Sequence, residues 1–211
     1  MTDDLAVQRV RGHPVPATPA GTHELVEALG AAAEAGIGAG DLPGARRWAR
    51  RLADHPLLAE VGHRATGRLL VADALAGDAE AVLTGGVRFL DAWQAAGSPV
   101  RSVLGPPAAA VAMIHGLRDD RDSRRAVLDR LDDSPGRTGG YGAVFDAMLL
   151  LHRGQAARAL ERLAPEPGEV GQWVTWIWLH WYVVLRAEAA VLAGSPDARD
   201  RLAVARAVVA G

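Results

Sequence analysis

The chain contains no cysteine, no lysine and no long uninterrupted apolar run. Without cysteine it has no disulfide, no thiolate nucleophile and no cysteine-bound zinc. Without lysine it has no Schiff-base amine and no phosphate-binding loop that ends in lysine. The longest apolar stretch, residues 174–185, is shorter than the roughly 20 residues that a membrane-spanning helix needs. We therefore expect no membrane partner.

All 23 basic residues are arginine, and 25 acids balance them to a formal net charge of −2. Both signs are interspersed along the chain, so no extended basic field could neutralise a run of phosphates. We expect no direct nucleic-acid partner. Two acids follow Met1, and no apolar stretch of signal-peptide length comes after them, which predicts a cytoplasmic location.

The 211 residues are 49% hydrophobic, enough for a sizeable core. Their periodicity is helical. In residues 43–56, Ala45, Trp48 and Leu52 share one helix face by three- and four-residue spacing, and arginines crowd the other face. We expect the first face to be buried and the second to be solvated. No stretch shows the alternation of a strand, so the sequence predicts an all-α protein.

A glycine at the start of a polar segment recurs at regular intervals and indicates a corner between two helices. The five corners are Gly40-Asp41, Gly77-Asp78, Gly116 with the residues after it, Gly154-Gln155 and Gly194-Ser195. Successive glycines lie 37 to 40 residues apart, slightly more than the roughly 34 residues of a tetratricopeptide repeat (TPR). The pattern predicts an α-solenoid of about five tandem helix-turn-helix, TPR-like pairs over residues 22–211. Residues 1–21, with three late prolines, are predicted to be a loosely ordered leader.

Four of the six tryptophans fall within residues 173–181. At helical spacing Trp173, Trp176, His180 and Trp181 form one stripe, which makes these residues the candidate binding residues. Three interpretations are open. Core packing between neighbouring pairs is the favoured one, a homodimer or partner interface is the second, and an aromatic-lined ligand groove is the third.

The residue types needed for catalysis occur without the spacing that catalysis requires. The seven histidines include no pair at i and i+4 and no adjacent glutamate of the zinc-protease kind. Carboxylate pairs such as Asp119-Asp120 stand among arginines, as solvated charges at helix ends do. We therefore predict no enzyme, no catalytic residue, no cofactor and no metal.

The last segment ends on an apolar set, Leu202, Ala205, Val208 and Val209, that no polar capping helix protects. Solenoids usually need such a cap at their ends. The chain is therefore expected either to be a piece of a longer protein or to cover this face by association.

Three stretches resemble a known family: residues 40–54 (GDLPGARRWARRLAD), residues 149–163 (LLLHRGQAARALERL) and residues 181–211. They are similar to the helical-repeat region of large actinobacterial LuxR-type transcriptional regulators, over roughly residues 22–211. The resemblance implies a regulatory segment that senses or scaffolds by receiving a small molecule or a protein. This sequence lacks the family's phosphate-binding loop and its DNA-reading helix-turn-helix. The resemblance therefore carries over neither ATP hydrolysis nor DNA binding, and no functional residue.

These observations favour a non-enzymatic module that binds a protein or peptide on a concave face lined by the first helix of each pair. The alternative is a small-molecule sensor. Its apolar pocket would lie between the aromatic helix and a helix break at Gly105-Pro106-Pro107. An enzyme with a site assembled from scattered residues is the third and least supported hypothesis.

Overall fold

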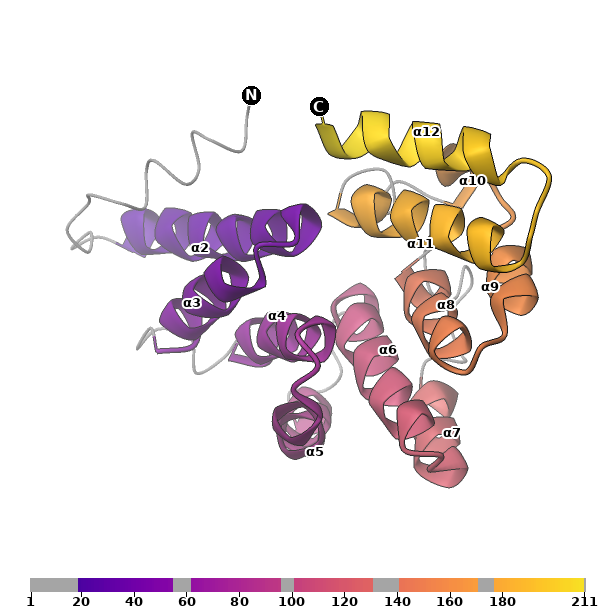
Figure 1. Ribbon diagram of the computed structural model, residues 1–211. Helices are drawn as coiled ribbons and strands as arrows, with labels where there is room; N and C mark the ends of the chain where they lie inside the picture. The colour runs from indigo at the N-terminus through magenta and orange to yellow at the C-terminus, as the bar shows by residue number, and fades with distance from the viewer. Residues whose placement is uncertain (1–18, 55–61, 96–100, 131–140, 171–176, 211) are drawn as a thin grey trace. The chain divides into compact units, whose positions relative to one another are not determined.

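The computed structural model describes residues 19–54, 62–95, 101–130, 141–170 and 177–210 (Figure 1). All regular structure in these ranges is helical, which confirms the predicted all-α class. No described helix is long and apolar enough to cross a membrane. The arrangement of the helices as a solenoid stays a prediction.

The described helices form five consecutive pairs, and the two helices of each pair pack against each other. The pairs are α2 (Pro19–Ala39) with α3 (Leu42–Ala53), α4 (Gly62–Leu75) with α5 (Ala79–Ala95), α6 (Arg101–Leu117) with α7 (Arg121–Asp129), α8 (Tyr141–His152) with α9 (Ala156–Arg162), and α11 (Leu179–Leu192) with α12 (Ala198–Ala210). A short helix, α10 (Pro167–Val170), stands between the last two pairs.

The chain divides into two compact units, Met1–Pro99 and Val100–Gly211. In the first unit α3 packs against both α2 and α4, and α5 packs against α4. In the second unit α6 packs against α7 and α8, while α11 packs against α8, α9 and α12. A single repeat domain over residues 22–211 stays a prediction. Residues 1–18 of the predicted leader lie outside the described residues, and residues 19–21 belong to α2.

Four of the five predicted corners have one backbone geometry. Their glycines, which are Gly40, Gly77, Gly154 and Gly194, have positive φ angles between 66° and 80°. Glycine occupies this left-handed region without the steric cost of a Cβ, and it ends helices there. At the second corner the amide of Asp78 donates to the Asp73 carbonyl, five residues back, over 2.9 Å. This bond satisfies a carbonyl that the end of the helix would leave unpaired.

The third corner lies three residues after the predicted Gly116. Gly116 is inside α6, and Asp119 takes the left-handed conformation with φ 58°. Asp120 then caps α7 by accepting a hydrogen bond from the Ser123 amide at 3.1 Å. The prediction was wrong because aspartate also tolerates this conformation. Gly116 serves close packing instead, since a Cβ on it would lie 2.5 Å from Leu149 Cδ2 on α8.

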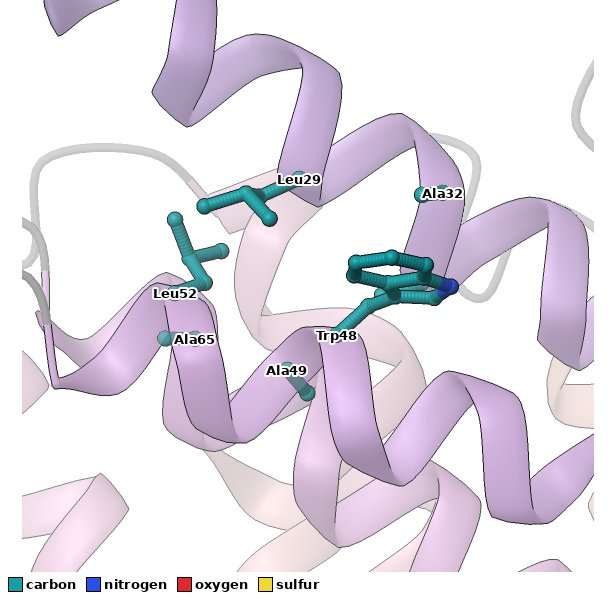
Figure 2. Close-up of a cluster of buried hydrophobic side chains, with 7 residues drawn as sticks. Leu29, Ala32, Trp48, Ala49, Leu52 and Ala65 are labelled. Atoms are coloured by element: carbon teal, nitrogen blue, oxygen red, sulfur yellow. The ribbon is translucent and has the colours of Figure 1, made fainter. Parts of the chain in front are cut away.

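The core of the first unit confirms the predicted face of the second helix. Trp48 and Leu52 of α3 are buried against Leu29 of α2 and Ala65 of α4 (Figure 2). Arg47, on the polar side, places its guanidinium 5.3 Å from the Trp48 ring centroid. A cation over the face of an aromatic ring covers part of the ring while its charged group stays in solvent.

The predicted helix break at Gly105-Pro106-Pro107 is wrong, because α6 continues through both prolines. Each proline removes one amide donor and disfavours the helix locally. Residues 107–114, however, are all buried, so the packing of this apolar segment outweighs the local cost.

Candidate partner-binding surfaces

The predicted aromatic stripe is only partly within the described residues. Trp173 and Trp176 lie outside them. His180 and Trp181 lie in the first turn of α11, and both are half-buried. The structure thus places two of the four candidate residues on one helix, and the binding role of all four stays a prediction.

The neighbouring aromatic side chains belong to the core of the second unit. Trp178 is buried and meets Phe145 of α8 edge to face, with ring centroids 5.4 Å apart. Tyr182 is also buried, and its hydroxyl donates to the Pro165 carbonyl over 2.9 Å. Burial raises the pKa of Tyr182, so the hydroxyl stays a donor. Trp178 and Tyr182 therefore belong to the core, and the core interpretation of the four candidate residues stays a prediction.

A buried arginine fixes α11 to the segment before α10. Arg186 donates to both carboxylate oxygens of Glu166, over 2.9 and 2.6 Å, and to the Ala164 carbonyl over 3.0 Å. The bidentate hydrogen bond to Arg186 lowers the pKa of Glu166, and the same bond raises the pKa of Arg186. This arrangement is structural, since both terminal nitrogens of the guanidinium donate within the chain, whereas the buried Nε has no hydrogen-bond partner among the described residues.

Exposed apolar side chains concentrate on the last helix pair. Six of the seven large hydrophobic residues exposed in the described part of the chain belong to it, and we call them the terminal apolar surface: Val184, Val191 and Leu192 of α11, and Leu202, Val204 and Val209 of α12. The seventh is Val87 of α5. Helical spacing places Leu202 and Val209 on one side of α12 and Val204 on another. A concentration of exposed apolar side chains on one helix pair is typical of an interaction surface, whereas scattered single residues are not.

The prediction of an uncovered last helix is confirmed for Leu202 and Val209, which are 37% and 57% exposed. It is wrong for Ala205, which is buried against Val183 and Ala187 of α11, and for Val208, which packs on the same cluster. Helical spacing explains the difference: Ala205 and Val208 share the face that turns toward α11, while Leu202 and Val209, seven residues apart, lie beside it.

A second surface was not predicted from the sequence. A groove of about 580 Å³, here called the α7 groove, lies along α7 beside the end of α6 and the end of α8. Its charged lining residues are Arg121, Asp122, Arg124, Arg125, Asp129 and Arg153. The run of three arginines at residues 121–125 was the available signal, but Arg153 joins it only through the packing of the third and fourth pairs.

The described residues do not contain a group of three or more histidines and acids that could hold a metal ion. The most buried carboxylate is that of Asp73, whose Oδ1 lies 2.5 Å from Arg46 Nε. Burial raises the pKa of Asp73, and the nearby Arg46 opposes this effect. Arg46 also contacts Asp78 at 2.9 Å, so this ion pair links α3 to the second corner.

Comparison with known proteins found no matching family model, no matching curated protein and no matching solved structure. The resemblance to LuxR-type regulators therefore stays a prediction.

Proposed function

We propose that this chain is a non-enzymatic helical-repeat module that binds a protein partner, with an amphipathic helix of the partner seated on the terminal apolar surface. The observation that carries the proposal is the concentration of exposed hydrophobic side chains on α11 and α12. Apolar surface of this kind gains free energy when another apolar surface removes it from water.

The chain itself supports the choice of a helix as the occupant. The second helix of a pair is covered by the first helix of the next pair at two places: α4 packs on α3, and α11 packs on α9. By contrast, α11 is the only described helix on which α12 packs extensively. A helix from a partner would extend the same mode of packing by one element.

The composition of α12 also fits a helix-binding surface. Arg199, Asp200 and Arg206 are exposed beside the apolar side chains, and a polar rim around an apolar centre is typical of protein interfaces. Complete burial of one valine or leucine is worth about 1.5–3 kcal/mol. Because the six side chains are partly covered already, each would supply on the order of 1 kcal/mol.

The first test is photo-crosslinking from α12 in living cells of the host. We would place p-benzoylphenylalanine at Arg206, which is exposed on α12, and at Arg88, which is exposed on α5. The probe at position 206 is expected to capture a helical segment of a different protein, and the probe at position 88 is not. A crosslink from position 206 to a second copy of this chain would contradict the proposal.

The second test uses the partner that the crosslink identifies. Leu202→Glu combined with Val209→Glu is expected to weaken the binding of that partner by at least about tenfold, because two charges would need desolvation at the interface. The matched control is Val87→Glu, at the exposed hydrophobic residue outside the last pair, and it is expected to bind normally. Normal binding by the double variant, with its melting temperature unchanged, would refute the proposal.

A further inference from the structure

Four arginines and two aspartates line the α7 groove, so its lining carries an excess of positive charge. The chain as a whole has a net charge of −2. Ion pairs with Asp146 and Asp119 balance Arg124 and Arg153, so the positive charge that no ion pair among the described residues balances is that of Arg121 and Arg125. The groove lies on helices other than those of the terminal apolar surface.

Two of the arginines are held by the fold. Arg124 Nη2 donates to Asp146 Oδ1 over 2.9 Å. Arg153 Nη2 donates to the Gly116 carbonyl and to Asp119 Oδ1, each over 2.6 Å. These bonds tie the wall of the groove to α6 and α8 and fix the position of both guanidinium groups.

The other two arginines are not held in this way. Arg121 and Arg125 are exposed and lie four residues apart on α7, so their side chains are neighbours on one face. No acid in the described part of the chain forms an ion pair with either of them. Arg121 is the first residue of α7, where the helix dipole disfavours a positive charge, and Arg125 lies in the middle of this nine-residue helix.

We infer that the α7 groove binds a short acidic segment of a protein partner, with carboxylates of that segment seated on Arg121 and Arg125. The planar guanidinium fork accepts a carboxylate through two parallel hydrogen bonds. Bound carboxylates would also relieve the repulsion between the two arginines. This inference rests on the proposed function, because it names the chemistry of a second contact with the partner.

Two features favour a peptide over a free anion. The groove volume of about 580 Å³ falls in the range of sites that hold a molecule of many atoms. Leu128 adds an apolar contact within the lining.

The test is fluorescence anisotropy with a fluorescein-labelled hexaglutamate peptide and the full chain. We expect binding that weakens as salt is added, because the contacts are exposed ion pairs, and no binding of labelled hexaglutamine. Arg121→Gln with Arg125→Gln is expected to weaken hexaglutamate binding by about tenfold or more. Arg51→Gln with Arg88→Gln, two exposed arginines of the first unit, removes the same charge and is expected to have no effect.

Three results would overturn the inference. The first is that the Arg121→Gln, Arg125→Gln variant and the Arg51→Gln, Arg88→Gln control bind hexaglutamate equally well. Complete displacement of the peptide by millimolar inorganic phosphate would indicate a free-anion site, and tighter binding of a single-stranded oligonucleotide would indicate a nucleic-acid site. The anisotropy assay reports on α7 and the crosslink from position 206 reports on α12, so failure of this inference is distinguishable from failure of the proposed function.

Discussion

Helices α3 and α12 are the second helices of the first and the last described pair, and they differ in what covers them. Each follows a corner with a glycine in the left-handed conformation, and each carries several arginines and apolar residues. Yet α3 buries five residues, Gly44, Ala45, Trp48, Ala49 and Leu52, whereas α12 buries only Ala205. The difference follows from their neighbours, since α3 packs between two helices.

This comparison separates local determinants of structure from tertiary ones. The corner determines where the second helix begins, and its glycine has the same left-handed conformation whether or not another helix covers the second helix. The burial of α3 depends in addition on α2 and α4, which pack on either side of it. The apolar residues of α3 therefore stabilise the fold, while Leu202, Val204 and Val209 of α12 contribute little to it and remain available for a partner.

The largest expected effect comes from truncating Trp48. Trp48→Ala would leave a cavity among α2, α3 and α4, and we expect it to lower the free energy of unfolding by about 3–5 kcal/mol. Leu202→Ala on α12 is expected to change it by no more than about 0.5 kcal/mol, because the side chain is 37% exposed. Urea denaturation of both variants measures the difference. Similar losses would show that α12 is covered as α3 is.

An effect of intermediate size is expected at two glycines that are required for different reasons. Gly77 is required by its own backbone conformation, and Gly116 is required because a neighbouring side chain leaves no room for a Cβ. Gly77→Ala is expected to cost about 1–2 kcal/mol, because its φ of 80° is unfavourable for alanine while a Cβ would meet nothing within 4 Å. Gly116→Ala is expected to cost about 1–3 kcal/mol, because its Cβ would clash with Leu149.

Double variants with Leu149→Ala separate the two causes. Leu149→Ala removes the clashing methyl groups, so its effect and that of Gly116→Ala should be strongly non-additive in the free energy of unfolding. Leu149→Ala and Gly77→Ala should be additive, because a Cβ on Gly77 would meet nothing within 4 Å. Additivity in both pairs would mean that Gly116, like Gly77, is required by its own backbone.

The helices and four corners could be predicted because their signals are local: apolar spacing, left-handed glycines and capping aspartates. The third corner could not, because Asp119 can replace glycine at φ 58°, and the choice depends on how closely α6 approaches α8. The continuity of α6 through Pro106 and Pro107 was missed for a similar reason, since burial of the residues that follow outweighs a local signal.

The candidate surfaces were predictable to different degrees. The exposed side of α12 follows from the helical spacing of its own apolar residues, and Leu202 and Val209 were identified from this local pattern. The α7 groove forms only because Arg153 lies beside residues about 30 positions earlier in the chain. A local sequence pattern cannot predict such a contact. The split of the aromatic segment into buried Trp178 and half-buried Trp181 likewise depends on where α8 lies.

The smallest expected effect is on the pH dependence of stability, through a carboxylate at the corner before α12. The Asp197 carboxylate accepts hydrogen bonds from Arg201 Nε at 2.8 Å and Ser195 Oγ at 2.6 Å. The bond from Arg201, followed by that from Ser195, lowers the pKa of Asp197 from 3.8 to about 2. A carboxyl with a lowered pKa stabilises the folded state above its ordinary pKa, and this contribution is lost as the pH falls through the folded value.

We therefore expect Asp197→Asn to lower the melting temperature slightly at pH 5, and the difference from the parent chain to vanish between about pH 4 and pH 2. The shift should be small, because the carboxylate is solvent-accessible. Asp200→Asn, in the first turn of α12, is the matched control, since it removes the same charge without these two hydrogen bonds. Circular dichroism at several pH values measures both variants. A difference that persists at pH 2 would show that the last corner does not depend on this carboxylate, and that α12 is positioned by its packing on α11 alone.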